Sequence, residues 1–322
     1  MAVSSDMILG ALLGTAVGDA LGMPIEGLSH QNVRTYYKGI KEYRDDDQRR
    51  DLDAGQWTDD TQMTFALARV LANHPHQPDR WPRAVADEYL DLRSQARRWG
   101  PTTTAAVDRL ADGAGPAEAG AADRPTDGAA MRAAPLGVWW ATCDVGRDEA
   151  FDAVRSVLAV THRHPAALAA GWGQAAAVRI LLGWAPEAFD RSTFWNRLAD
   201  TTRQAEERLG GGDRVSDRLE SLAGQIDSFP LDLRDACGRV GVRADEAWPF
   251  ASAMVARRPH LLENTLLSGI NVGGDADTTG AMMGAMLGAL HGWNAFPDEW
   301  TEGLEAEGRL REDARALADA LR

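Results

Sequence analysis

Two apolar segments of the sequence carry a glycine at every fourth position. The glycines of the first segment, near residues 8–21, are Gly10, Gly14, Gly18 and Gly22, and those of the second, near 278–291, are Gly280, Gly284 and Gly288. A glycine inside a helix costs about 1 kcal/mol relative to alanine. A row of them on one helix face is therefore expected only where two backbones approach closely. We predict that both segments are central helices and are closely packed.

Apolar residues recur at three- and four-residue intervals over most of the chain. Clear stripes begin at Ile8, Met63, Val154 and Met282, and the first of them follows a Ser4-Ser5-Asp6 cluster suited to capping a helix. No run of five or more residues shows the strict alternation that marks a half-buried strand. The sequence therefore predicts an all-α protein.

The chain shows no clear division into separate parts. Residues 112–128 form a Gly/Ala/Pro-rich loop, and residues 185–246 are polar and read as peripheral helices. Neither stretch is long or biased enough to serve as a linker, and no internal repeat suggests a solenoid. We expect residues 1–322 to form a single domain, with a monomer as the default.

Charge and cysteine usage limit the partners and the compartment. The formal net charge of −14 argues against duplex or single-stranded nucleic acid as a partner, since phosphate binding requires a basic face. The two cysteines have no metal-like spacing, which suits a reducing cytoplasm. The apolar N-terminal stretch carries Asp6 and Asp19 and no basic residue before Arg34, unlike a secretory signal. We expect no membrane span and a cytoplasmic location.

Acidic and hydroxyl residues stand at the start of two predicted helices. Thr58-Asp59-Asp60-Thr61 precedes one apolar stripe, and Asp275-Ala276-Asp277-Thr278-Thr279 precedes another. For either segment alone, helix capping is a sufficient explanation, because Thr and Asp are favoured at helix N-termini. If the two helix starts converge, however, four carboxylates occupy a small volume and require compensation. Divalent cations that prefer oxygen ligands, namely Mg²⁺, Mn²⁺ or Ca²⁺, would supply it.

Five blocks of sequence together resemble the ADP-ribosylglycohydrolase family. In chain order they are GALLGTAVGDALGMPIEG, GQWTDDTQMTFALA, TDGAAMRAAPLG, THRHPAALAAGWGQA and NVGGDADTTGAMMGAMLGAL, which extend over residues 10–290. Any one block is a weak signal, whereas the combination of TDDT with GGDADTTGA is highly specific. The resemblance implies an all-α orthogonal multi-helix bundle with a metal-binding cleft that holds two Mg²⁺ or Mn²⁺ ions.

The resemblance also implies which residues form the metal centre. The implied metal ligands are Thr58, Asp59, Asp60, Asp275, Asp277 and Thr278. Asp277 occupies the position that usually bridges the two ions. Glu26, in the PIEG segment, corresponds to a glutamate near the metals that influences ligand entry and catalysis. The implied catalytic set is therefore Glu26 with Asp59, Asp60 and Asp277.

A second group of residues is implied to bind ADP-ribose. It comprises Gly100, Thr102, Thr126, Asp127, Gly128, Met131 and His162. The loop from Thr126 to Arg132 would hold the diphosphate with backbone N–H groups ahead of a helix. A buried core histidine is the alternative for His162, and the role of His164 is open. Trp57 and Trp172 are candidates for the border of the cleft, with the core as the alternative.

Two departures from the family pattern leave the substrate open. Asp127 is acidic where relatives often carry Asn, Ser or Gln, and Arg97-Arg98-Trp99 replace an acid expected before Gly100. We interpret the two arginines as a solvated face, with anion contact as the alternative. The predicted function is metal-dependent release of ADP-ribose from a protein side chain or small molecule, by attack of water at the anomeric carbon of the distal ribose. The alternatives are a catalytically silent ADP-ribose-binding module and another all-α Mg²⁺-dependent hydrolase of phosphorylated sugars or nucleotides.

Overall fold

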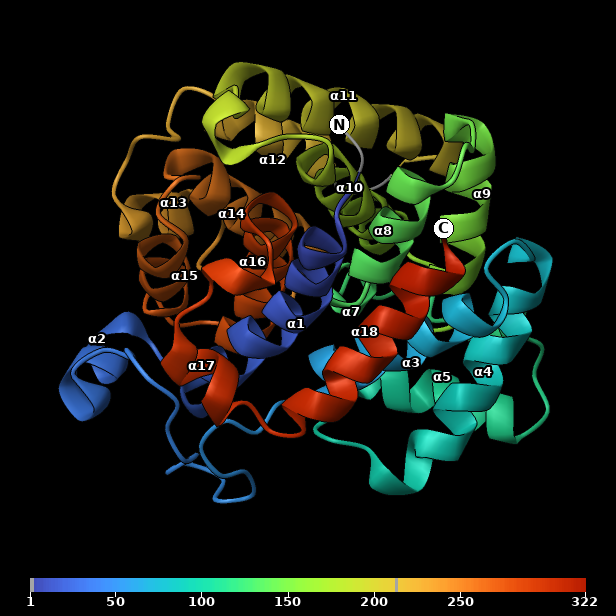
Figure 1. Ribbon diagram of the computed structural model, residues 1–322, viewed down its shortest axis with the longest axis horizontal. Coiled ribbons are helices and arrows are strands. Elements are labelled where there is room, and N and C mark those ends of the chain that lie inside the picture. The colour runs from blue at the N-terminus through green and yellow to red at the C-terminus, as the bar shows by residue number, and fades with distance from the viewer. Residues whose placement is uncertain (1–2, 212–213) are drawn as a thin grey trace.

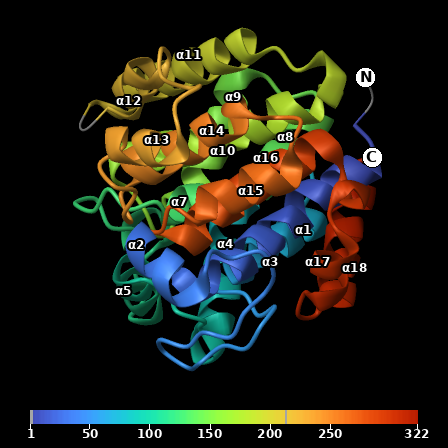
Figure 2. The same ribbon diagram turned by 90° about the vertical axis from the view of Figure 1, so that its left-hand side faces the viewer.

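The computed structural model describes residues 3–211 and 214–322 (Figures 1 and 2). Within these ranges the chain contains no strand, only isolated bridges such as that between Ser29 and Gly273, so the all-α prediction is confirmed. The α-helices are α1 (Ser5–Gly22), α2 (His30–Asn32), α3 (Asp59–Asn73), α4 (Trp81–Leu92), α5 (Pro101–Ala111), α6 (Pro116–Ala119), α7 (Gly128–Met131), α8 (Ala134–Thr142), α9 (Arg147–Leu158), α10 (Pro165–Leu182), α11 (Arg191–Leu209), α12 (Val215–Leu222), α13 (Pro230–Ala236), α14 (Ala244–Arg257), α15 (Leu262–Ile270), α16 (Ala276–His291), α17 (Asp298–Gly303) and α18 (Glu307–Ala320).

Helices α1 and α16 lie side by side and antiparallel through the middle of the molecule (Figures 1 and 2). Their glycines interlock in pairs. Gly10 meets Gly288, Gly14 meets Gly284 and Gly18 meets Gly280, and a Cβ built on any of these glycines would lie under 3.0 Å from the partner's backbone. Both helices are buried along nearly their whole length. The prediction of two central, closely packed helices is confirmed. The helices can approach this closely because the glycines at their contact have no side chains.

Local sequence signals set several helix boundaries. The Ser4 side chain accepts a hydrogen bond from the Met7 N–H at 3.2 Å and caps α1 as the capping cluster predicts. The loop at 112–128 is interrupted only by the short helices α6 and α7. The polar stretch 185–246 folds into α11, α12 and α13, with α11 along the outer edge of the molecule in Figure 1.

One expectation from the sequence requires correction. The segment Ser5–Ile25 is long and apolar enough to cross a membrane by length and composition, although the sequence analysis found no such stretch. Its most apolar window is entirely buried inside the protein, where α1 packs against α16. The high hydropathy of this segment is explained by its place at the centre of the bundle, where all of its faces contact other helices.

Candidate metal centre and ribose pocket

The acidic segments lie at the first turns of α3 and α16 without capping them. Thr58 is the N-cap residue of α3 and Asp275 is the N-cap residue of α16, yet neither side chain bonds to an N–H of its own helix. The capping interpretation is therefore wrong for these two side chains. They are left free to face other groups.

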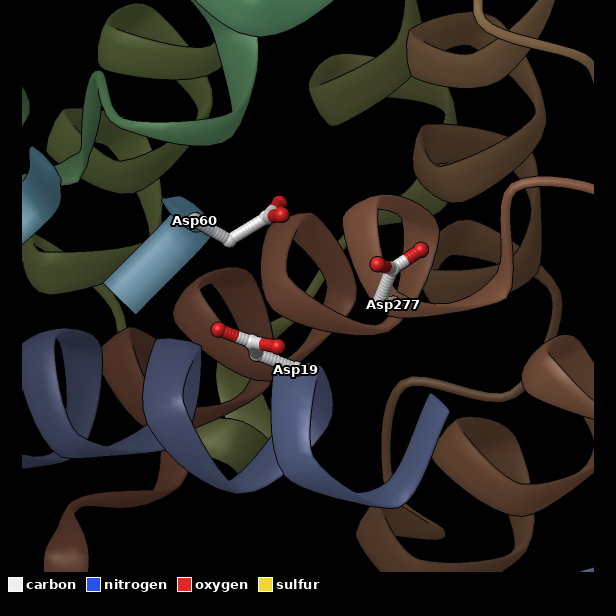
Figure 3. A group of neighbouring side chains, drawn as sticks. All are labelled: Asp19, Asp60 and Asp277. Carbon is white, nitrogen blue, oxygen red and sulfur yellow. The ribbon is translucent and has the colours of Figure 1, made fainter. Parts of the chain in front are cut away.

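The two helix starts converge at the end of α1. Asp19, Asp60 and Asp277 come from α1, α3 and α16, and their side chains point into one shared space (Figure 3). One carboxylate oxygen from each lies within 4.8 Å of the others, and all three residues are buried. The hydroxyl oxygens of Thr58 and Thr278 lie 3.1 and 3.4 Å from Asp60 Oδ2. The convergence on which the metal hypothesis depends is present in the structure.

Asp19 is the member of this cluster that sequence reasoning missed. Its carboxylate accepts hydrogen bonds from the N–H and the hydroxyl of Thr58, at 2.9 to 3.0 Å, and from those of Thr61, at 3.0 and 2.6 Å. It thereby holds the start of α3 against α1. Burial raises the pKa of Asp19 to about 6 against the lowering effect of these bonds. The available signal was a lone carboxylate, directly after Gly18, in an otherwise apolar segment.

We expect Asp19→Asn to destabilise the protein by about 2 kcal/mol. An amide keeps one acceptor oxygen but turns an N–H₂ group toward the donors of Thr58 and Thr61, so two of them lose their partner. Urea unfolding in EDTA at pH 5, below the Asp19 pKa of about 6, measures this loss, because removal of the charge then gives a smaller compensating gain than at neutral pH. Asp87→Asn, an exposed change of the same kind in an i,i+4 pair with Arg83, should stay within about 0.5 kcal/mol of the wild type. Equal stability of the Asp19 and Asp87 variants would contradict the anchoring role.

One pocket opens directly beside this cluster. Its lining includes the predicted metal-centre residues Glu26, Asp59, Asp275, Asp277 and Thr278, and the predicted ADP-ribose residues Gly100, Thr102, Thr126, Asp127, Gly128, Met131 and His162. Thr58 and Asp60 are buried just behind it, next to Thr278. Residues from six distant parts of the sequence thus share one site. Their individual roles stay predictions.

Simultaneous ionisation of all the acids at this site is unfavourable, because they are buried and close to one another. Burial, reinforced by repulsion from neighbouring carboxylates, raises the pKa values of Asp59, Asp60, Asp275 and Asp277 well above the ordinary value. Burial likewise raises the pKa of Asp127 to about 7. Among the described residues, four buried carboxylate oxygens have no hydrogen-bond partner; they are Asp60 Oδ1, Asp127 Oδ2, Asp275 Oδ2 and Asp277 Oδ1. Unpartnered buried oxygens on several carboxylates are the donor set that suits hard divalent cations.

Arginines hold the rim of the pocket together. Arg49 pairs with Glu26 through two contacts of 2.6 and 3.0 Å, and Arg98 approaches Glu26 at 3.4 Å. Arg98 also pairs with Asp46 and Asp51, and only 8% of its side chain is exposed. The solvated-face interpretation is thus wrong for Arg98, which ties the irregular segment 44–52 to the rim. The backbone of Arg98 is left-handed (φ 56°), a conformation that is rare outside glycine.

Buried polar groups hold the predicted diphosphate loop, Thr126 to Arg132, in place. His162 lies between Thr161 Oγ1 and Thr126 Oγ1, at 2.7 and 3.0 Å from its two ring nitrogens. Burial lowers the pKa of His162 well below its ordinary value, so the ring is neutral. Arg132 donates to the Gly128 carbonyl and to Thr161 Oγ1. His162 therefore lines the pocket as expected and is also held as a core histidine would be.

Three other sequence candidates lie outside the pocket. The His164 side chain caps α10 by accepting from the Ala166 N–H at 3.1 Å. Trp57 donates to the Glu305 carbonyl and is covered by Arg97, which pairs with Glu305. Trp172 is buried and stacks on Trp140 with ring centroids 4.4 Å apart. The suggestion that the two tryptophans border the cleft is wrong, because packing partners from distant segments draw both rings into other contacts.

The sequence and the fold of this chain are similar to those of known proteins. The ADP-ribosylglycohydrolase family model matches residues 2–322. An uncharacterized protein of Archaeoglobus fulgidus is 33% identical over 320 residues, which cover 95% of this chain and 94% of the relative. The ADP-ribosyl-[dinitrogen reductase] glycohydrolase of Rhodospirillum rubrum is 29% identical, with 98% and 95% coverage. A solved structure titled ADP-ribosylglycohydrolase-related protein complex superposes with a TM-score of 0.76 and 28% identity, covering 99% of each chain.

Proposed function

We propose a function for this chain, which belongs to the ADP-ribosylglycohydrolase family. The protein is a metal-dependent hydrolase that releases ADP-ribose from an ADP-ribosylated protein side chain or small molecule. The observation that carries the proposal is the cluster of buried, unpartnered carboxylate oxygens at the starts of α3 and α16. A module that only bound ADP-ribose would gain nothing from carboxylates that repel one another. The site of action would be cytoplasmic, and the chain a monomer.

The proposed ion ligands are the residues of the two helix starts. Thr58, Asp59 and Asp60 would contribute from α3, and Asp275, Asp277 and Thr278 from α16, around two Mg²⁺ or Mn²⁺ ions. Hard oxygen donors of this kind suit either ion. When bound, such ions supply Lewis-acid chemistry at the ribose hydroxyls. Bound cations would also offset the burial and the mutual repulsion that together raise the pKa values of Asp60 and Asp277.

The side chains around the pocket would bind and orient the sugar. Thr102 and Thr126, whose hydroxyls are 3.2 Å apart, and the neutral His162 offer uncharged hydrogen-bonding groups. Asp127, with a pKa of about 7, is partly protonated near neutral pH, which lessens its repulsion of a diphosphate. As water attacks the anomeric carbon and the bond to the leaving group breaks, Glu26 would accept a proton from the water and pass it to the leaving group. In the structure this carboxylate is paired with Arg49 at 2.6 Å.

The test is a panel of linkages with and without chelator. The purified protein is incubated with arginine-, serine-, acetyl- and nucleotide-linked ADP-ribose in Mg²⁺ or Mn²⁺, and free ADP-ribose is quantified. We expect release from at least one substrate and its loss in EDTA, with recovery when the ion is restored. EDTA-insensitive release would refute the metal dependence.

Two further outcomes separate the alternatives. Binding of ADP-ribose without release from any linkage would favour the silent binding module. Failure to bind ADP-ribose, together with release of phosphate or sugar from simple phosphorylated sugars or nucleotides, would favour a different Mg²⁺-dependent hydrolase. Both results would overturn the proposed activity.

A further inference from the structure

A second pocket lies near the C-terminal end of α10, away from the acidic cluster. It is formed where α8, α10, α11 and the start of α9 meet, and it encloses about 280 Å³. Its lining includes Arg147, Arg179, Arg197, Trp140 and Thr201. Arg179 lies fourteen residues along α10 from Pro165, a distance of about 21 Å at 1.5 Å per residue. Since His162 stands just before Pro165, the two pockets lie toward opposite ends of one helix.

The three arginines of this pocket have no acidic partner among residues 3–211 and 214–322, although the chain as a whole is strongly acidic. Arg147 donates to Gln204 and to Thr201 Oγ1, both uncharged. Within the described part of the chain, Arg179 and Arg197 make ring contacts and no hydrogen bond. The guanidinium carbon of Arg179 lies 4.4 Å from the centroid of the Trp140 ring. These three arginines, all exposed to solvent, form a local excess of positive charge around one cavity.

Arginines elsewhere on α11 show the usual arrangement. Arg203 pairs with Asp200 and Glu220, and Arg208 pairs with Asp148 and Asp152. Acids are therefore plentiful on the same surface but are directed to other cations. In the pocket, by contrast, burial and repulsion from Arg147 and Arg197 lower the pKa of Arg179. Binding of an anion would stabilise arginines that repel one another in this way.

A second observation independently points to a ligand. The indole N–H of Trp140 has no hydrogen-bond partner within the described ranges, and Trp140 is only 5% exposed. Buried indole N–H groups usually find an acceptor. Trp140 lines this pocket, and its ring is held between Trp172 and Arg179. A ligand with several acceptor oxygens would serve both this donor and the guanidinium groups.

We propose that the pocket of Arg147, Arg179 and Arg197 is a binding site for a small phosphate-bearing anion. Guanidinium groups match phosphate oxygens in a planar, two-pronged geometry, and phosphate offers acceptors to several donors at once. The volume is at the low end for ligand pockets, which suits a diphosphate-sized ligand. The site is separate from the ribose pocket and is independent of the hydrolase activity proposed above.

The test is calorimetric titration of the full chain with pyrophosphate at constant ionic strength in EDTA. Chelation keeps the acidic ribose pocket free of ions and therefore repulsive to anions, so the arginine pocket is the site observed. We expect saturable binding that Arg179→Gln weakens by about tenfold or more, since a charged hydrogen bond contributes about 1.5–3 kcal/mol. The control variant Arg203→Gln also removes one positive charge, but from a position on α11 outside the pocket. It should change the affinity less than about twofold.

Thermal unfolding shows whether the variant is folded. Without pyrophosphate, Arg179→Gln should be about as stable as the wild type, because removal of a repelled cation offsets the loss of its contact with the Trp140 ring. Pyrophosphate should stabilise the variant less than the wild type. Tighter binding of ADP than of pyrophosphate would identify a nucleotide as the occupant, and weaker binding would identify the free anion. The proposal is overturned if pyrophosphate does not bind, or if it binds the Arg179 and Arg203 variants equally well.

Discussion

Asp277→Asn is expected to lower the rate of ADP-ribose release by about a thousandfold or more. Lewis-acid stabilisation of a transition state is worth several kcal/mol, and each 1.4 kcal/mol is a factor of ten in rate. Asp277 belongs to the oxygen cluster with Asp60, and its Oδ1 is buried without a partner. The exchange of one carboxylate oxygen for an amide nitrogen preserves the volume but removes the charge that would hold the ions. Single-turnover release in saturating Mg²⁺ or Mn²⁺ measures the loss.

The same substitution should have the opposite effect on stability when no ion is bound. Burial and the neighbouring acids raise the pKa of Asp277, so the ionised carboxylate destabilises the fold above the pKa of the unfolded chain. In EDTA at neutral pH the variant should therefore unfold at a higher temperature than the wild type. The control is Asp313→Asn, which removes a carboxylate of α18 that pairs with Arg69 of α3. It should leave the rate unchanged. Normal hydrolysis by the Asp277 variant would refute the ligand assignment.

Gly284→Ala is expected to destabilise the protein by about 3 kcal/mol or more, or to prevent folding. A Cβ at this position would lie under 3.0 Å from the carbonyl oxygen of Gly14, so α1 and α16 would have to move apart along their whole contact. Overpacking of a tight core costs about 1–3 kcal/mol and occasionally more. Here the obstacle is backbone on both sides, which cannot rotate away. Urea unfolding measures the change.

The control is Gly308→Ala, the same substitution in a helix with space around it. Nothing lies within 4 Å of a Cβ built at Gly308, which is an exposed position in the first turn of α18. The greater helix propensity of alanine should increase stability there by up to about 1 kcal/mol. If both variants change stability in the same direction and by similar amounts, the close approach of α1 and α16 is not a determinant of the fold.

The central helices and the two acidic turns were predictable because their signals are local. A four-residue glycine period has few explanations other than close helix contact, and Gly14 and Gly284 meet as that period implies. TDDT and DADTT made a shared acidic site conditional on the convergence of the two turns, the family resemblance implied that convergence, and Asp60 and Asp277 do meet. In both cases two segments carry matching patterns, so each supports the interpretation of the other.

Residues whose role depends on an unrelated segment were not predictable in the same way. Asp19 is one carboxylate in an apolar run, and its function appears only when Thr58 and Thr61 are placed against it. Arg98 looked like part of a solvated pair until Asp46 and Asp51 were found around it. Nothing in the sequence near Arg179 indicates that its neighbours on α9 and α11 are also arginines. Long-range partners of this kind require coordinates.

The central claim is that the starts of α3 and α16 share divalent ions. It is tested most directly by calorimetric titration of the metal-free chain with Mn²⁺, and then with Mg²⁺, for the wild type and for Asp60→Asn. The account predicts two ions bound per wild-type chain and loss of at least one of them in the variant. The absence of saturable binding, or identical binding by both proteins, would contradict it.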